Sequence, residues 1–231
     1  MIAIESMPLR WPLRIPALRG RLVHVWKADL SVLEEGYERL EALLSTEERQ
    51  RALGYLLPGH RRRFRMVRGA LRELLGAYLQ RDPIDIELSR GDEGKPMLTA
   101  GLGTTLHFNV SHSRGLALLS FCEQAQVGVD VEYLDATVDS DVVANTAFSQ
   151  SEQARYRGDG TEQRLCTFFR IWTQKEARIK AHGLAMAHRY FPSAEQLPVV
   201  DLPLGAQYVG AVALWDPHIG ARQTDPYRSN E

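Results

Sequence analysis

Cysteine is scarce in this chain, with Cys122 and Cys166 the only two among 231 residues. Neither belongs to a Cys-x-x-Cys pair or to a Cys/His cluster, which argues against a structural zinc site and against a disulfide framework. A reducing compartment is the default for such a chain. The scarcity of cysteine therefore favours a cytoplasmic protein that is held together by its own hydrophobic core.

Long hydrophobic runs are also missing. No apolar run approaches the roughly 20 residues that are needed to span a bilayer. The first twenty residues lack the uninterrupted apolar core and small-residue cleavage site of a secretory signal. We therefore expect a cytoplasmic protein without a membrane partner.

A surplus of one charge sign is absent as well. The 28 basic and 29 acidic residues leave a net charge of −1, so the overall balance gives no attraction to a polyanion such as nucleic acid. A hydrophobic content of 44% and a charged content of 25% are ordinary for a globular protein. The length allows one large domain or two of about 115 residues each.

The hydrophobic periodicity predicts helices that alternate with groups of strands. Strands are expected at 21–28, 84–88, 105–110, 115–122, 127–133 and 206–215. Helices are expected at 31–44, 60–80, 141–148 and 161–182, the last ended by Gly183. Two further helices begin at the capping boxes Ser45–Glu48 and Ser149–Glu152, and Pro58 and Gly59 are expected to end the first of these.

This order of elements predicts two α+β halves of similar size, residues 1–122 and 123–231. No sequence repeat relates the halves, so their similarity is inferred from element order alone. Residues 1–20, rich in Pro and Arg, are expected to form an irregular arm. The polar residues 217–231 are expected to form a loose tail.

The strand at 127–133 carries two carboxylates on one face. Valines alternate with polar residues here, so Asp130 and Glu132 point to the face opposite the valines, and Gly128 beside them is expected to leave open space. Two like charges about 5 Å apart repel by roughly 3 kcal/mol at an effective dielectric near 20. A divalent cation such as Mg²⁺ would relieve that repulsion. An edge strand with a solvated polar face explains the same pattern.

The helix at 161–182 places a charge in the middle of its apolar side. The apolar residues that span this arc of about 100° are Leu165, Phe168, Phe169, Trp172 and Ile179. Glu176 falls at the centre of the arc, and Lys180 follows one turn later. A buried carboxylate needs a cation, a hydrogen-bond network or a water-filled cleft. A surface Glu176–Lys180 pair, worth about 0.3–0.5 kcal/mol, would suit only the rim of that face.

Two further segments carry polar groups that suit an anion. His107, Asn109 and Ser111 share one strand face, although these residue types are also ordinary turn formers. A serine hydrolase is excluded, since no G-x-S-x-G motif exists and the adjacent Ser111 and His112 would point to opposite faces.

The second such segment is helical. Arg61, Arg65, Arg68 and Arg72 form one stripe, which suits phosphates, although a solvated helix face is the more common explanation of such a charge run. Lys95 lies in a tight turn ahead of a strand, in a segment that by itself indicates only a loop.

Four motifs in this order resemble those of a known family. They are GKP at 94–96, FNVSHS at 108–113, GVDVE at 128–132 and FFRIWTQKEARIK at 168–180. Together, over about 90 residues, they resemble the 4′-phosphopantetheinyl transferases of the Sfp type. The resemblance implies a pseudo-twofold α+β fold of two similar halves. Each half would be a small, mostly antiparallel sheet with helices, and coenzyme A would bind in the cleft between them.

The resemblance also implies a reaction. The phosphopantetheine arm of coenzyme A would move to a serine of an apo acyl or peptidyl carrier protein, releasing 3′,5′-ADP. Asp130, Glu132 and Glu176 would hold Mg²⁺, with Mn²⁺ as a substitute. Glu176 would be the general base, and Lys180 would meet the pyrophosphate. The expected catalytic residues are thus Asp130, Glu176 and Lys180. The protein is expected to be a monomer, with no nucleic-acid partner.

The coenzyme contacts follow from the same resemblance. Lys95, Ser111 and His112 match positions for the coenzyme's phosphates, and His112 would lie near the 3′-phosphate. Arg51 and Arg63 fall where relatives carry basic residues near the nucleotide.

Two departures stand out. Glu48 replaces a lysine of some relatives, which would weaken coenzyme contact there. Residues 180–184 are shorter than the usual K-A-x-G-x-G-L pattern, which puts the conformation of the following loop in doubt.

Other points stay open. The carrier interface is expected in the stretch 134–160. Two rival hypotheses are a nucleic-acid-binding module that uses the arginine stripe and a coenzyme-binding protein without turnover.

Overall fold

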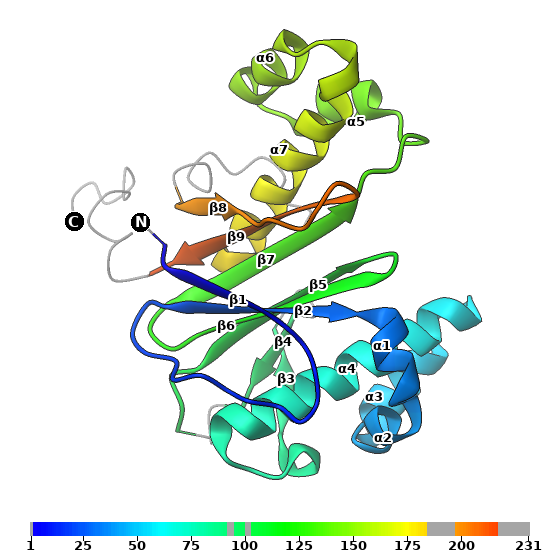
Figure 1. Ribbon diagram of the computed structural model, residues 1–231, viewed down its shortest axis with the longest axis vertical. Coiled ribbons are helices and arrows are strands. Elements are labelled where there is room, and N and C mark those ends of the chain that lie inside the picture. Colours follow the sequence, from blue (N-terminus) through cyan, green and yellow to red (C-terminus); the bar gives the residue numbers. More distant parts are fainter. Residues whose placement is uncertain (1, 92–94, 100–102, 184–196, 217–231) are drawn as a thin grey trace, which may run out of the picture.

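Four layers make up the protein: a long helix, two sheets packed face to face, and a second long helix (Figure 1). The computed structural model describes residues 2–91, 95–99, 103–183 and 197–216. The described strands and helices form a mixed α+β fold with mainly antiparallel sheets, which confirms the predicted fold class. No helix in the described ranges is long and apolar enough to cross a membrane.

The first sheet has the strand order β1-β2-β6-β5. Its strands are β1 (Ile4–Pro8), β2 (Val23–Asp29), β5 (His107–Ser113) and β6 (Leu116–Cys122). β1 pairs parallel to β2, and the other neighbours are antiparallel. A separate antiparallel ribbon joins β3 (Leu88–Arg90) to β4 (Pro96–Leu98). The helices of this part are α1 (Leu30–Glu35), α2 (Tyr37–Ala42), α3 (Thr46–Leu53), α4 (Pro58–Leu79) and the 3₁₀ turn η1 (Pro83–Asp85).

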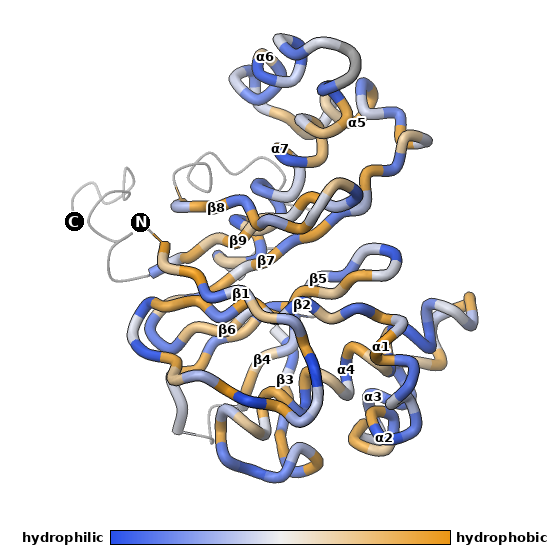
Figure 2. The backbone as a smooth tube through the Cα atoms, viewed as in Figure 1, coloured by the Kyte–Doolittle hydropathy of each residue, from blue (hydrophilic) through white to orange (hydrophobic). Residues whose placement is uncertain are grey.

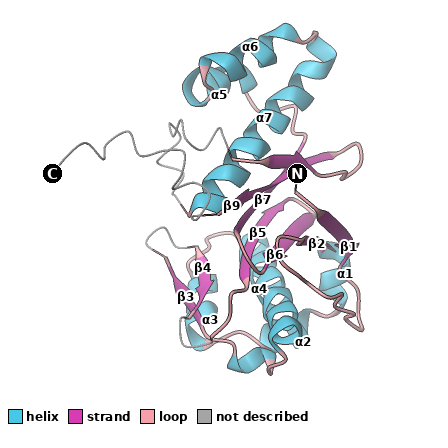
Figure 3. Cartoon of the chain, turned by 90° about the vertical axis from the view of Figure 1, so that its left-hand side faces the viewer, coloured by secondary structure: helices cyan, strands magenta, loops and turns pink. Residues whose placement is uncertain are grey.

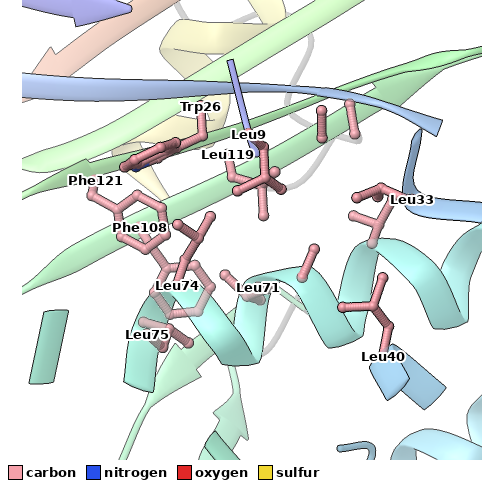
Figure 4. Close-up of a cluster of buried hydrophobic side chains, with 14 of the residues drawn as sticks. Leu9, Trp26, Leu33, Leu40, Leu71, Leu74, Leu75, Phe108, Leu119 and Phe121 are labelled. Atoms are coloured by element: carbon pink, nitrogen blue, oxygen red, sulfur yellow. The ribbon is translucent and has the colours of Figure 1, made fainter. Parts of the chain in front are cut away.

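Helix α4 covers the outer face of this sheet. Its inward leucines, such as Leu71 and Leu74, pack with Trp26, Phe108 and Phe121 from the strands (Figure 4). Apolar residues at a spacing of three and four produce this stripe, as the sequence predicted. The layer is thick because large side chains from both elements fill it.

The second sheet has the order β7-β9-β8. Its strands are β7 (Gln126–Tyr133), β8 (Val199–Asp201) and β9 (Tyr208–Trp215), and helix α7 (Thr161–His182) crosses its outer face (Figure 3). Val127, Val129 and Val131 of β7 are buried against the first sheet. Helices α5 (Ser140–Ala147) and α6 (Gln150–Gly158) pack against the beginning of α7. The carboxylate face of β7 is therefore turned toward α7.

Local sequence signals at helix ends are mostly confirmed. Ser45 and Ser149 each open a helix through a complete capping box. Gly183 ends α7 in the left-handed conformation, with φ of 82°.

Several predicted boundaries are wrong. Gly36 divides the helix expected at 31–44 into α1 and α2, because glycine is a poor residue for a helix interior. Pro58 begins α4 and does not end α3, since the fixed φ of proline suits the first helical turn. Of the strand expected at 84–88, only Leu88 lies in a strand, β3, because residues 84 and 85 belong to the turn η1.

The irregular arm expected at residues 1–20 is also wrong in part. Residues 4–8 form the edge strand β1, and Leu9 and Leu18 are buried in the core. The expected boundary between the halves lies between β6 and β7. The polar tail lies outside the described residues.

Candidate active site

Polar side chains of β5 hydrogen-bond to the backbone of β7 along one border of the two packed sheets, and we call this contact the junction. Asn109 Oδ1 accepts a hydrogen bond from the Val129 N–H at 3.0 Å, and Ser113 Oγ accepts one from the Tyr133 N–H at 3.1 Å. Ser111 Oγ accepts from the Val131 N–H at 3.4 Å. The side chains that suggested an anion site therefore also link β5 to β7. His107, on the same face, is exposed.

Asp130 lies at the centre of the junction and is 3% exposed. Its Oδ1 accepts hydrogen bonds from Lys180 Nζ at 2.6 Å and from Ser111 Oγ at 2.8 Å. Its Oδ2 is buried and has no hydrogen-bond partner within the described ranges. A buried carboxylate oxygen without a donor is costly, so this atom is suited to a further cation.

Glu132, two residues along β7, is half-buried and accepts a hydrogen bond from Ser113 Oγ at 2.8 Å. Loss of water raises its pKa, and the charges of Asp130 and Glu176 raise it further. The Ser113 hydrogen bond and the Lys180 charge act in the opposite direction. The three carboxylates are therefore close enough to interact electrostatically.

Glu176 is 4% exposed on α7, so the idea of a surface pair at the rim does not describe it. Close packing brings α7 to β7. A Cβ added to Gly128 would lie 2.0 Å from the carbonyl oxygen of Ala177 and 2.3 Å from the nitrogen of Ala181. The space expected beside Gly128 is therefore not open, because the backbone of α7 fills it.

The three carboxylates of Asp130, Glu132 and Glu176 are the candidate ligands of a metal ion. Among the described residues, no group of three or more His, Cys, Asp or Glu side chains is gathered tightly enough to hold an ion. Asp130, Glu132 and Glu176 nevertheless supply the oxygen donors that Mg²⁺ prefers. The Oδ2 of Asp130 has no partner among the described residues, and burial and the charge of Asp130 raise the pKa of Glu132. The chemistry of the three residues fits a divalent cation.

A cavity of about 450 Å³ lies between α3, α4 and the β3–β4 ribbon. Four arginines from three elements line it, Arg51, Arg68, Arg72 and Arg90, and they outnumber the glutamates of the lining, Glu47, Glu48 and Glu87. Burial lowers the pKa of Arg68 to about 10, Glu48 opposes this shift, and the charges of the other three arginines add to it. A smaller pocket of about 180 Å³ shares Arg51 and Arg68 with this cavity and reaches His112. Together they form a cationic groove that leads toward β5.

The arginines of the α4 stripe make different contacts. Arg72 is 2% exposed and donates to Glu48 and to the carbonyl oxygens of Pro83 and Ile86. Arg65 binds Glu41 on α2. Only Arg68 and Arg72 of the stripe line the cavity.

Glu48 lies inward, between two arginines. Its Oε2 accepts from Arg72 Nε at 2.7 Å, and its Oε1 lies 3.6 Å from Arg68 Nε. Its charge is therefore neutralised within the wall of the cavity.

The remaining predicted residues surround the junction. Lys95 Nζ donates to the carbonyl oxygen of Lys180 at 2.7 Å, and burial, with the charge of Lys180, lowers the pKa of Lys95 to about 8. His112 is exposed, yet its pKa is lowered by partial loss of water and by the charges of Arg63 and Lys180. Arg51 lies farther along the groove.

The predicted arginine stripe included Arg68 as a candidate for phosphates. The sequence analysis did not name Arg90, and nothing local marks it. Gly94 of the GKP motif and the loop after Gly183 lie outside the described residues.

The chain is similar in sequence to proteins of a known family. A model of the 4′-phosphopantetheinyl transferase superfamily matches residues 126–226. The chain is 40% identical over 166 residues to the 4′-phosphopantetheinyl transferase HetI of Nostoc sp., covering 71% of this chain and 70% of that protein.

Two other relatives match more weakly. The 4′-phosphopantetheinyl transferase AcpT of Salmonella typhi is 38% identical over 97 residues, which is 42% of this chain and half of that protein. The 4′-phosphopantetheinyl transferase Sfp of Bacillus subtilis is 30% identical over 156 residues, covering 62% of this chain and 67% of that protein.

The layered α+β fold and a junction where basic side chains meet carboxylates suit a group-transfer enzyme, which is the class of the relatives named above. The chain belongs to the 4′-phosphopantetheinyl transferase superfamily, as its four motifs predicted.

Proposed function

We propose that the protein moves the 4′-phosphopantetheine arm of coenzyme A to a serine of an apo acyl or peptidyl carrier protein and releases 3′,5′-ADP. One observation carries this proposal most directly. The cationic groove from Arg90 to His112 leads to the junction where Asp130 and Lys180 are bonded. A long substrate with a phosphate monoester and a pyrophosphate matches such a groove in charge.

Coenzyme A would bind along this groove. Arg51, Arg63 and Arg68 would meet the nucleotide, since guanidinium groups suit phosphates. Within the described part of the chain, Arg51 and Arg63 form no ion pair with a carboxylate, so their charges are available to a ligand. His112, Lys95 and Ser111 would lie along the phosphates, and Lys180 would pair with the pyrophosphate.

Asp130, Glu132 and Glu176 would hold Mg²⁺, and Mn²⁺ would substitute for it. The bound ion would supply positive charge to the pyrophosphate as negative charge develops on the leaving 3′,5′-ADP. This assignment would account for the electrostatic interaction of Glu132 with Asp130, Glu176 and Lys180.

The protein's own residues would carry the proton and the charge. Glu176 would accept the proton of the acceptor serine as the serine Oγ–phosphorus bond forms and the bond from phosphorus to the oxygen of 3′,5′-ADP breaks. Lys180 is already oriented by Asp130 and Ser111 at 2.6 and 3.2 Å. Such preorganisation stabilises developing charge without a further rearrangement.

The test is incubation of the protein with coenzyme A, Mg²⁺ and several unrelated apo carrier domains. Intact mass should show one phosphopantetheine on each accepted carrier, and chelation of the metal should prevent it. Coenzyme A binding in calorimetry together with no adduct on any carrier would support a binding protein without turnover. Tight, salt-sensitive binding to DNA or RNA would favour the nucleic-acid module instead.

We propose that the protein is a cytoplasmic monomer, and its two free cysteines support a reducing compartment. Sedimentation at micromolar concentration tests the monomer, and fractionation of cells tests the location.

A further inference from the structure

Three exposed leucines gather at the turn between α3 and α4. Leu53, Leu56 and Leu57 are 53%, 94% and 59% exposed. The start of α4 projects at the edge of the molecule, with strongly hydrophobic residues at its tip (Figure 2). Single exposed leucines are normal on a protein surface, but several within five residues indicate a contact surface.

The same turn is strongly basic. The chain from Arg49 to Arg72 contains eight arginines and no acidic residue. His60 is exposed, and Arg63 is half-buried and forms no ion pair with a described carboxylate. The leucines therefore have a cationic border, which is the arrangement of an interface with an apolar centre and a polar rim.

This surface adjoins the candidate active site. Tyr55, which lies between Leu53 and Leu56 in the chain, lines the pocket that reaches His112 on β5, and the charges of Arg63 and His60 both lower the pKa of His112. His112 follows Ser111, whose hydroxyl binds Asp130. A protein bound over the leucines would therefore lie at the mouth of the groove.

We propose that Leu53, Leu56 and Leu57, bordered by His60 and Arg63, form the docking surface for the acceptor protein, and that this partner presents an acidic surface around an apolar side chain. The inference rests on the proposed function, in which the acceptor is a folded carrier domain. Charge complementarity of this kind accelerates the encounter and selects the partner. It places docking on α3 and α4 and not on the stretch 134–160, where Val142 is the large apolar side chain exposed among the described residues.

The experiment measures the KM for an apo carrier domain with the full-length protein. Leu56→Glu should raise this KM about tenfold, because the new charge repels an acidic partner and one apolar contact is lost. Affinity for coenzyme A and the rate at saturating carrier should be kept. Leu56→Lys should raise the KM much less. Val142→Glu is the matched control, since Val142 is an apolar side chain 59% exposed on α5, and its KM should equal that of the wild type.

Three other outcomes would contradict the proposed docking surface. An active wild type whose KM is unchanged by Leu56→Glu, or is raised by Val142→Glu in its place, would overturn the docking surface alone. A concentration-dependent dimer that Leu56→Glu dissociates without changing KM would assign the leucines to a second copy of the chain. A wild type that modifies no carrier would overturn the proposed function and the docking surface with it.

Discussion

The two long helices have the same length, but side chains of different size pack them against their sheets. Helices α4 and α7 each span 22 residues, and each covers the outer face of one sheet (Figure 3). Leucines such as Leu71 and Leu74 hold α4 above the first sheet. Alanines hold α7, and Ala177 and Ala181 pack against Ala211 and Ala213. Large side chains keep α4 at a distance, whereas small ones let the backbone of α7 approach β7.

The packing of each helix determines where its charged side chains lie. The close approach of α7 brings Glu176 and Lys180 to the carboxylates of β7. The thicker layer under α4 leaves its arginines on the flank, where they line a cavity. Under the proposed function, the first region would supply cations to the phosphates of coenzyme A, and the second would supply carboxylates to a metal and a base. The following changes, ordered by expected effect, test that division.

Removal of the central carboxylate should have the largest effect. Asp130→Ala should lower the transfer rate about a thousandfold, which corresponds to about 4 kcal/mol of activation free energy, because Lys180 loses its orientation and the proposed cation site loses a ligand. Mass spectrometry of the carrier measures the rate, and circular dichroism verifies the fold.

Asp135→Ala is the matched control. Asp135 lies just beyond the end of β7, where it binds Arg114 at 2.5 Å, away from the three carboxylates. Its removal should leave transfer near the wild-type rate. A comparable loss in both variants, or wild-type turnover in Asp130→Ala, would refute the role given to Asp130.

An added methyl group at Gly128 or at Gly69 should lower stability in both cases, but should lower activity only at Gly128. Gly128→Ala would place a Cβ 2.0 Å from the Ala177 carbonyl oxygen, and Gly69→Ala would place one 2.3 Å from the Leu40 carbonyl oxygen. Overpacking of this kind costs about 1–3 kcal/mol or more. Both variants should unfold at lower urea concentration. Gly128→Ala should also lower kcat, because α7 is displaced, and Gly69→Ala should keep it. Equal kcat values in the two variants would contradict the comparison.

The carboxylate region could be predicted from the sequence because its signals are local. Alternation along β7 places Asp130 and Glu132 on one face, and helical spacing places Glu176 among apolar residues. The cationic region was predicted less well. Arg90 joins Arg68 only because the β3–β4 ribbon folds beside α3 and α4, and no local pattern records that contact.

The junction itself was not predicted. Asn109 looked like a ligand because the sequence does not reveal that β5 lies beside β7. The edge strand β1 was missed for the same reason, since its partner β2 lies about twenty residues away.

Loosening the junction should have a moderate effect. Asn109→Ala removes the acceptor of the Val129 N–H, and a buried donor without a partner costs about 1–2 kcal/mol. Chemical denaturation should show this loss. Asn145→Ala, at an exposed position on α5, should change stability by less than about 0.5 kcal/mol. Equal stability of the two variants would show that the side-chain links of β5 do not hold the sheets together.

The smallest effect should appear where the two regions touch, at Lys95. Its pKa of about 8 lies below the value of about 10.4 expected in an unfolded chain. The folded protein therefore binds fewer protons than the unfolded chain between these values, and coenzyme-free stability should rise with pH across that window. Affinity for coenzyme A should change the opposite way, because phosphates favour the protonated amine.

Calorimetry at pH 7 and pH 9 measures that affinity. The protonated fraction of Lys95 falls from about 0.9 to about 0.1, so the Kd should rise by at most about tenfold. Lys95→Arg keeps its charge throughout this range and should remove the pH dependence. His112 should contribute less to this pH dependence, since its pKa is lowered from 6.5 by burial and by nearby positive charges. A variant with the wild-type pH dependence would exclude Lys95 as the phosphate-binding cation that joins the arginine groove to the carboxylates of α7 and β7.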